Sequence, residues 1–444
     1  MFWIQLVLLL VIIYFGIRYG GVALGLLGGL GVSILVFGFG MVPGKPPIDV
    51  MLIILAVVTT SSTLEATGAL NLIVRFAERI LRSNPQYIVY LAPISTFTLT
   101  MLMGTGHAVY PLLPVIYDVS IKQGIRPERP MGVAAIASQM GITASPISAA
   151  TAATIGIALL YGVHLSIITI LLVTIPACFC GMLLAATWSL KRGLDLSKDP
   201  VFIEKMKDPE MREYINGKFD SAAGTEIPRD AKRALGIFLG GIVLVVILAM
   251  FPQQLIPKGV DGKTISMTLV LQFVMLGVGA VILFCTKLKA KEISDSKVFN
   301  AGMVAVIMIF GIAWMSETVI EGNKDYLIGI ISDTVKAHPW TFALAMFTFS
   351  TLLKSQAATL TVMLPLGFAM GVPTATLVGC IPASYAYFFF CFYPSDLAAI
   401  SFDRSGTTHV GKYIFNHSFM IPGLIGTWTA VIIGYCLANY VYTI

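Results

Sequence analysis

The chain has 444 residues, of which 57% are hydrophobic and 12% are charged, and its mean hydropathy is +0.86. A soluble globular protein carries roughly twice that share of charged residues, so the composition excludes an ordinary soluble enzyme or binding domain. Apolar runs of about 20 residues recur along the chain, which predicts a polytopic helical membrane protein. The net charge of +6 does not indicate a nucleic-acid partner, because membrane helices need basic anchors on one side.

The apolar runs divide the chain into full-length and interrupted segments. The first run has no basic residue before it and no cleavage site after it, so we expect a retained span and not a signal peptide. Two stretches, about 86–121 and 339–372, are too long for one crossing and carry polar residues at their centres. Full-length spans are predicted at 2–18, 21–40, 48–66, 130–161, 164–190, 232–251, 265–286, 298–318, 374–402 and 413–440.

Basic residues near the span ends set the predicted orientation, because Lys and Arg concentrate on the cytoplasmic side. All the clusters agree if both termini are periplasmic. The polar segment 193–230 is then a cytoplasmic linker. The basic clusters are Arg18, Arg75 with Arg79 and Arg82, Lys122 with Arg126 and Arg129, Lys191 with Arg192, Arg229 with Lys232 and Arg233, Lys287 with Lys289 and Lys291, and Arg404 with Lys412.

Proline-containing breaks of the first half return in the second half. Asn84-Pro85 corresponds to His338-Pro339, and Ser145-Pro146 corresponds to Tyr393-Pro394. Each half then contains five crossings and one interrupted run, and an odd number of crossings inverts the second half. We therefore predict an all-α polytopic membrane protein of inverted five-span repeats, 1–192 and 231–444, joined by the linker.

The two interrupted runs are predicted to be re-entrant hairpins. A run of this length that begins and ends on the same side must turn near the bilayer centre. The turns would be Gly104–His107, entered from the cytoplasm, and Lys354–Thr359, entered from the periplasm. Non-helical backbone at that depth is tolerated only when it is buried in protein or lines an aqueous cavity. Inverted repeats with broken helices at the midplane are typical of secondary transporters.

Four helix interruptions are expected to converge on a binding site: the two hairpin turns, 142–148 and 392–396. Each exposes amide donors at the start of a half-helix, and hydroxyl groups are dense around them. A helix dipole contributes only about 0.3–2 kcal/mol, so dipoles alone would not hold a dianion. Several charge-assisted hydrogen bonds of about 1.5–3 kcal/mol each could do so, which favours a dicarboxylate ligand.

Charged and titratable residues near the breaks each allow a functional and a structural reading. Lys354 could neutralise a substrate, or form a structural ion pair. Asp396 could pair with it, carry a proton or bind a cation. Arg404 could hold a carboxylate with its planar fork, although a cytoplasmic anchor also explains it. His107 could titrate or serve as a satisfied hydrogen-bonding residue.

Several motifs spread over the whole chain resemble the anaerobic C4-dicarboxylate carriers of the Dcu type, and are closer to the B type than to the A type. Lys354 departs from the family pattern. The motifs are 42–50, Gly104-Thr-Gly-His107, 125–131, Ala144-Ser-Pro-Ile-Ser148, Ser355-Gln-Ala-Ala-Thr359, Tyr393-Pro-Ser-Asp396 with 397–400, and Phe402-Asp-Arg404 with 405–409.

The resemblance implies exchange of fumarate, malate or aspartate for succinate across the bacterial inner membrane, in support of fumarate respiration. It also implies a homodimer within the inverted-repeat ion-transporter superfamily, with elevator motion. Sodium ions or protons are the candidate coupling ions, with Asp396 and Asp403 as candidate carriers. The candidate substrate-binding residues are Gly104, Thr105, Gly106, His107, Thr143, Ser145, Pro146, Ser148, Lys354, Ser355, Gln356, Thr359, Tyr393, Pro394, Ser395, Arg404, Thr407 and Thr408.

Two other classes of function were weighed against a dicarboxylate exchanger. A cation/proton antiporter of similar architecture is the alternative, and its carboxylates would themselves be the site. An intramembrane enzyme is not expected, because the sequence has no clustered His-Glu motif, no nucleophile with an obvious base and no phosphate loop. The six cysteines lie in apolar runs without zinc-ligand spacing, so neither a metal nor a cofactor is expected.

Overall fold

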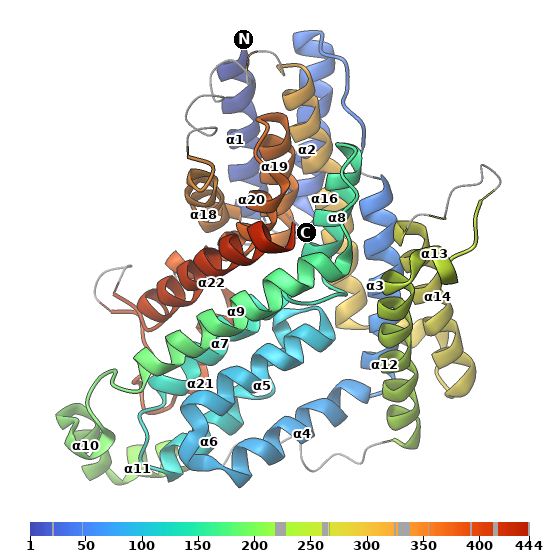
Figure 1. Cartoon of the computed structure of the whole chain (residues 1–444). Coiled ribbons are helices and arrows are strands. Elements are labelled where there is room, and N and C mark those ends of the chain that lie inside the picture. The colour runs from blue at the N-terminus through green and yellow to red at the C-terminus, as the bar shows by residue number, and fades with distance from the viewer. Residues whose placement is uncertain are drawn as a thin grey trace.

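The computed structural model describes residues 1–19, 22–46, 48–217, 228–259, 265, 267–323, 326, 338–353, 355–390, 393–411 and 416–442. Regular structure in these ranges is helical, apart from an isolated antiparallel bridge between Val410 and His417. Figure 1 shows the helices in three groups, with α10 and α11 projecting at the lower left. The predicted all-α class is confirmed.

The first half of the chain contains eleven of the labelled α-helices in chain order up to the end of the linker. They are α1 (Phe2–Tyr19), α2 (Ala23–Ser33), α3 (Ile48–Ala66), α4 (Ala69–Ser83), α5 (Ile88–Met103), α6 (Leu113–Lys122), α7 (Glu128–Thr143), α8 (Ala149–Leu160), α9 (Ile167–Ser189), α10 (Pro200–Lys207) and α11 (Pro209–Asn216). Shorter turns between them are η1 (Ile34–Gly38), η2 (Pro85–Tyr87), η3 (Gly106–Val109) and η4 (Leu196–Lys198).

The second half follows a similar order of long, interrupted and long helices. Its helices are α12 (Arg229–Met250), α13 (Pro252–Leu255), α14 (Met267–Cys285), α15 (Ala290–Ser294), α16 (Lys297–Glu321), α18 (Thr341–Leu353), α19 (Gln356–Ala369), α20 (Thr374–Gly379), α21 (Pro394–Phe402) and α22 (Met420–Val441). Single turns η6 (Ile381–Ser384) and η7 (Tyr387–Phe390) lie between α20 and α21.

The predicted helix breaks are confirmed at all four places. The chain interrupts its helices between α5 and η3, between α7 and α8, between α18 and α19, and before α21. Gly104 ends α5 in a left-handed conformation with φ 72°, which a residue with a Cβ adopts at a cost. Pro394 begins α21, where its missing N–H is not needed by the helix.

Two of the predicted full-length spans are wrong in extent. Residues 374–402 were predicted to form a span with one break at 392–396, but the first helix, α20, already ends at Gly379, and two single turns that begin near Pro382 precede α21. The last helix begins at Met420 and not at 413, because 403–411 fold as a loop around Asp403. An apolar composition marks burial in either case, so it does not distinguish a continuous helix from a folded loop.

Helix α4 was not predicted, because its residues are too polar for a span. It follows α3 after a bend of 70°. Gly68, with φ 74°, lies at the bend. Basic residues Arg75, Arg79 and Arg82 alternate around α4 with apolar ones, so the helix has one apolar and one charged face.

Several helices are apolar enough for a membrane protein. By length and composition, four helices of the described ranges could cross a membrane: Pro85–Met103, Ile167–Ser189, Val298–Glu321 and Met420–Val441. The bent pair Met51–Ala66 and Ala69–Ser83 would raise the number to five. The predicted ten-span count, the division into repeats and their inversion stay predictions, as do the re-entrant hairpins.

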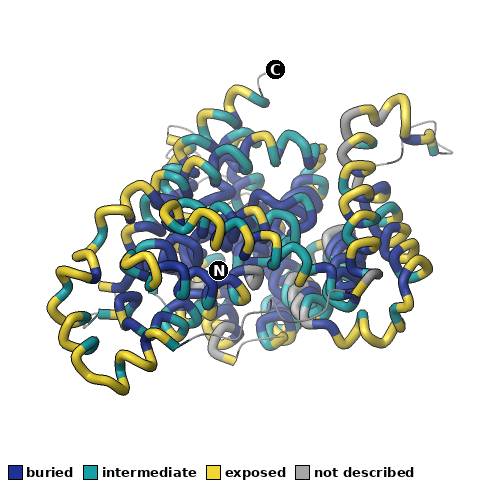
Figure 2. Tube along the Cα trace, turned by 90° about the horizontal axis from the view of Figure 1, so that it is seen from below, coloured by how far each residue is buried: buried dark blue, intermediate teal, exposed yellow. Residues whose placement is uncertain are grey.

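The described helices pack through three large apolar clusters and a small one at Val133, Ala185 and Ala186. One joins α3, α8, α12, α14 and α19, a second joins α4 to α7 with α22, and a third joins α1, α2 and α16. Helix α9 packs mainly on α22, and α5 mainly on α7, which forms the tilted band across the middle of Figure 1. Figure 2 shows buried residues in the centre and exposed ones around the rim.

Candidate functional site

Gln139 of α7 lies where the helix breaks come together. The first break meets it directly, because a Cβ added to Gly106 would overlap the Gln139 side-chain amide. The same break also touches the second one, since a Cβ on Gly104 would lie 3.0 Å from the Ile147 carbonyl oxygen. Glycines at these two positions therefore allow the backbone of the first turn to approach α7 and the segment after it.

Hydrogen bonds connect Gln139 to the other two breaks. The side-chain amide of Gln356, the first residue of α19, donates to the Gln139 carbonyl oxygen at 2.7 Å. The Tyr387 hydroxyl donates to Gln139 Oε1 at 2.8 Å and accepts from Gln356 Nε2 at 3.3 Å. Gln139 Nε2 lies 3.4 Å from Ser395 Oγ in α21. The expected convergence of the four interruptions is therefore observed, around a glutamine.

Asp396 adds a carboxyl group to this buried cluster. Its residue is 1% exposed, and its Oδ1 accepts a hydrogen bond from Ser395 Oγ at 3.3 Å. Within the described ranges, Asp396 Oδ2 and Gln356 Oε1 have no hydrogen-bond donor, although both atoms are buried. A buried acceptor without a donor costs about 1–3 kcal/mol. The cluster is therefore chemically suited to receive a proton, a cation or a hydrogen-bond donor.

Tyrosine rings form one wall of the cluster. Tyr387 and Tyr393 have ring centroids 4.3 Å apart, and Tyr385 packs edge-on against Tyr387 at 4.8 Å. Tyr385 and Tyr387 are fully buried. Such rings exclude water while presenting hydroxyl groups, which strengthens the polar contacts inside the cluster.

The hydroxyl groups at the second break bond mainly to their own segment. Ser148 caps α8 by accepting from Thr151 N at 3.2 Å, and Thr143 Oγ1 donates to the Met140 carbonyl oxygen at 3.1 Å. Ser145 Oγ accepts from Ile147 N, next to Pro146. These bonds hold the break in shape while the residues remain beside the first turn.

The turn between α18 and α19 follows the same pattern. Ser355 caps α19 by accepting from Ala358 N at 3.3 Å, and Thr359 Oγ1 donates to the Ser355 carbonyl oxygen at 2.8 Å. Lys354 lies outside the described residues, and so does the His107 side chain. Thr105 is half-buried beside Gly106.

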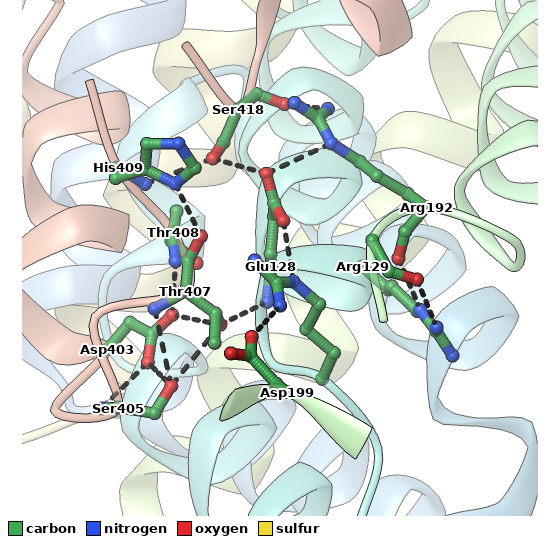
Figure 3. A network of polar contacts seen from close by, with 12 residues as sticks. Glu128, Arg129, Arg192, Asp199, Asp403, Ser405, Thr407, Thr408, His409 and Ser418 are labelled. Carbon is green, nitrogen blue, oxygen red and sulfur yellow. Dashed lines mark hydrogen bonds and ion pairs between the residues drawn. The ribbon is translucent and has the colours of Figure 1, made fainter. Parts of the chain in front are cut away.

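The candidate residues after α21 lie apart from the Gln139 cluster. Asp403 follows Ser395 by eight residues and directly succeeds the last residue of α21, which corresponds to a rise of about 12 Å. Asp403 accepts from Thr407 Oγ1 at 2.8 Å, from Thr408 N at 2.6 Å and from the Ser405 backbone and hydroxyl. The carboxylate of Asp403 thus organises the loop that ends the helix, as Figure 3 shows.

This loop joins a network of ion pairs at the start of α7. Glu128 N donates to Thr407 Oγ1 at 3.1 Å, and the buried Glu128 carboxylate pairs with Arg126 at 2.8 Å and with Arg192 at 3.0 Å. Arg126 also bonds Asp199 of the linker at 2.5 Å (Figure 3). The linker, α7 and the loop after α21 are thereby tied together by charge.

The network shifts the titration of its linker member. Burial by itself raises the pKa of Asp199. The hydrogen bonds from Arg126 and from the backbone of Val201 and Phe202 lower it by more, so the pKa lies below its usual range. Burial likewise lowers the pKa of Arg192, which stays charged beside Glu128.

Arg404 is part of the linker contact in this structure. Its guanidinium donates to the carbonyl oxygens of Tyr214 at 3.2 Å and Gly217 at 2.9 Å, and it lies over the Tyr214 ring at 5.2 Å. Carboxylate capture by Arg404 therefore stays a prediction, and the guanidinium is not among the groups that meet at Gln139.

Sequence reasoning missed Gln139, Tyr387 and Glu128. Gln139 lies within the apolar run 131–144, and an isolated amide in such a run was the available signal. Tyr387 lies in a tract of aromatic residues and gave no such signal. Glu128 follows Pro127 in a basic segment, where a solvated position is the ordinary expectation.

Comparison with known proteins identifies the family of the chain. A model of the family described as anaerobic C4-dicarboxylate membrane transporter matches residues 1–442. The chain belongs to this family. The resemblance stated from the motifs is confirmed, and the family's members are transporters and not enzymes.

Curated relatives match along the whole length. The anaerobic C4-dicarboxylate transporter DcuB of Escherichia coli O6:H1 is 45% identical over 99% of this chain and 98% of its own length. The C4-dicarboxylate transporter DcuA of Wolinella succinogenes is 35% identical over 98% of each. The higher identity to DcuB agrees with the predicted closeness to the B type.

A solved structure shows a related fold. The antimetabolite efflux pump MtrF of Neisseria gonorrhoeae superposes with a TM-score of 0.53 over 92% of this chain and 84% of that chain. Its sequence identity of 12% restricts the comparison to the fold. The likeness therefore concerns the overall course of the chain.

Proposed function

We propose that this protein carries C4-dicarboxylates across the membrane and binds them at the cluster around Gln139. Membership of the transporter family supports the substrate class. The single observation that carries the location is that breaks from both halves of the chain contact Gln139, or contact the turn that lies against it. Breaks at the start of α8, α19 and α21 offer backbone donors, which suit carboxylate oxygens.

A dicarboxylate bound there would face the Asp396 carboxyl group. Two like charges in a buried site repel each other strongly, so an ionised Asp396 opposes a dianion. We infer that Asp396 takes up a proton or a sodium ion together with the substrate. The undonated Asp396 Oδ2 and Gln356 Oε1 are the atoms that would hold it.

We further propose obligatory exchange of fumarate, malate or aspartate for succinate by alternating access, with an elevator movement. An empty site with unmatched donors and acceptors would cross the membrane reluctantly, whereas either loaded form has these groups satisfied. The proposal includes a homodimer in the bacterial inner membrane, with both termini periplasmic and the two hairpins re-entrant. The comparisons give no support to the cation/proton antiporter alternative.

Proteoliposomes test the transport proposal directly. Vesicles loaded with succinate should take up labelled fumarate, while vesicles without internal dicarboxylate should take up little. Equal uptake into both would overturn obligatory exchange. No uptake into either, by protein shown to be folded, would overturn the substrate class.

A second set of measurements tests the site and the coupling ion. Ser395→Ala and Gln356→Ala should weaken fumarate-induced thermal stabilisation, whereas Ser401→Ala, on the exposed side of α21, should not. Asp396→Asn should remove the dependence of uptake on external pH or sodium. Unchanged dependence in this variant would assign coupling to another group.

A further inference from the structure

A cavity of about 390 Å³ lies on the side of α4, next to α5 and α12. Its wall is mainly apolar and includes Leu72 and Phe76 of α4, Leu102 of α5 and Leu239 of α12. Two arginines of α4, Arg75 and Arg79, complete it. None of the residues that form the Gln139 cluster lines this cavity, and the function proposed above does not use it.

The charge of Arg79 at this cavity is not balanced by the carboxylates near it on α4 and α6. Arg82, one turn along α4, takes the nearby carboxylates, because it pairs with Glu78 at 3.0 Å and with Asp118 at 2.7 Å. Asp118 pairs in addition with Lys122 at 2.8 Å. Arg79 is exposed and forms no ion pair with any described residue. The cavity therefore offers positive charge beside an apolar wall.

The direction of α4 explains why the arginines and the apolar side chains of this cavity lie together. The bend of 70° after α3 turns α4 away from the course of a continuous span, and α4 runs across the lower end of the molecule in Figure 1. A helix with one apolar and one basic face lies stably at a membrane surface, with its cations at the level of the lipid phosphates. Phe76, at 64% exposure, is an apolar side chain available to contact lipid.

We propose that this cavity binds an anionic phospholipid. The guanidinium of Arg79, together with that of Arg75, would hold the phosphate, for which planar guanidinium groups have matching donor geometry. One acyl chain would lie along Leu102, Leu239 and Phe76. A free phosphate or a short dicarboxylate would leave this apolar wall uncovered, and a zwitterionic lipid would place a second cation beside the arginines.

The occupant would contact both sides of a joint in the fold. Leu102 lies two residues before Gly104, where α5 ends at the first helix break. Leu239 belongs to α12, which packs on α3 and α14 in a separate apolar cluster. Lipid at this place would therefore adjust how α5 and α12 lie against each other, without contacting the Gln139 cluster.

Lipid titration of the purified protein tests the proposal. The full chain in detergent is mixed with dioleoylphosphatidylglycerol, with dioleoylphosphatidylcholine or with inorganic phosphate, and bound lipid and Tm are measured. We expect the phosphatidylglycerol to bind and to raise Tm, and the phosphatidylcholine and the inorganic phosphate to have little effect. Arg79→Gln should weaken binding about tenfold, as expected for one charge-assisted hydrogen bond. Arg75→Gln with Arg79→Gln should weaken it further.

Two variants separate this site from general attraction to the membrane. Lys191→Gln removes an exposed cation elsewhere on the chain and should leave binding unchanged. Leu239→Trp fills the apolar part of the cavity without changing its charge, and should reduce binding of the phosphatidylglycerol. Equal binding of both lipids, or the same loss in Lys191→Gln as in Arg79→Gln, would overturn the proposal. Stabilisation by inorganic phosphate alone would replace the lipid with a simple anion.

Discussion

Replacing Gln139 with leucine tests whether the helix breaks are held together by one buried amide. Leucine has nearly the same volume, so the substitution removes polar atoms without opening a large cavity. The contact between the Gln139 carbonyl oxygen and Gln356 belongs to the backbone and is retained. What is lost is the acceptor for the Tyr387 hydroxyl at 2.8 Å and two long contacts of the amide nitrogen, to Ser395 and to Ser138, each at 3.4 Å.

The expected loss of stability follows from these lost contacts. The Tyr387 hydroxyl is fully buried, and a buried donor deprived of its acceptor costs about 1–3 kcal/mol. The Ser395 contact is near the limit of hydrogen bonding and adds little. We therefore expect Gln139→Leu to lower the free energy of unfolding by about 1–3 kcal/mol, and to weaken fumarate-induced stabilisation because Tyr387 and Ser395 lose the polar side chain that joins them.

A double-mutant cycle with Tyr387→Phe isolates the contact. Each single variant leaves one buried polar group without its partner, whereas the double variant removes both, so its penalty should be smaller than the sum by about 1 kcal/mol. Unfolding of the purified protein in detergent, with and without fumarate, supplies both readouts. Gln123→Leu, at an exposed position after α6, is the matched control.

Two results would refute this reasoning. Additive penalties in the cycle would show that Gln139 and Tyr387 do not act on each other. A Gln139→Leu variant with the stability and fumarate response of Gln123→Leu would show that the breaks are not joined through this amide, and the proposed site would have to move.

Three further predictions concern the ion-pair network of Glu128 and the first turn. Glu128→Gln should destabilise the protein by about 3 kcal/mol, because two arginines lose a buried partner; a change in Tm no larger than that of an exposed Glu204→Gln variant would contradict this. The Asp199 carboxylate has a lowered pKa in the folded state, so its contribution to stability is complete above its ordinary pKa of about 4 and is lost as the pH falls through the lowered value; Asp199→Asn should flatten this acid limb of a stability profile, and an unaltered profile would assign the limb to other groups. Gly104→Ala should cost about 1–2 kcal/mol for the left-handed backbone and more for the contact with the second break, so thermal unfolding should show a larger loss than Gly124→Ala, which has φ 65° and open space around it; equal losses would show that the close approach carries no energy.

The positions of the helix breaks were predictable from the sequence because they depend on local chemistry. Glycine and proline limit helix continuation wherever they occur, so the turn at Gly104 and the break before Pro394 follow from residue type and neighbours. The caps at Ser148 and Ser355 are equally local. The family resemblance, likewise, rested on motifs that are contiguous in sequence.

Helix α4 is a helix that hydropathy alone does not predict. Its apolar residues recur at helical spacing, but the arginines between them lower the hydropathy below that of a membrane span. The prediction that the helix continues beyond α20 was wrong for the opposite reason, because the residues that follow are apolar enough for a span but do not form a continuous helix. Apolar residues at 380–388 are buried, and burial alone does not distinguish a helix from irregular backbone.

What the sequence by itself determined is therefore the helical class, the breaks and the family, since each depends on short stretches of chain. Only the tertiary structure decided that Gln139, Gln356, Tyr387 and Ser395 meet, because hydrogen bonds across more than 200 residues depend on how whole helices pack. Packing also decided that Arg404 contacts Tyr214 and Gly217 of the linker. A guanidinium can bond many different oxygen atoms, so the sequence alone does not indicate which of them it reaches.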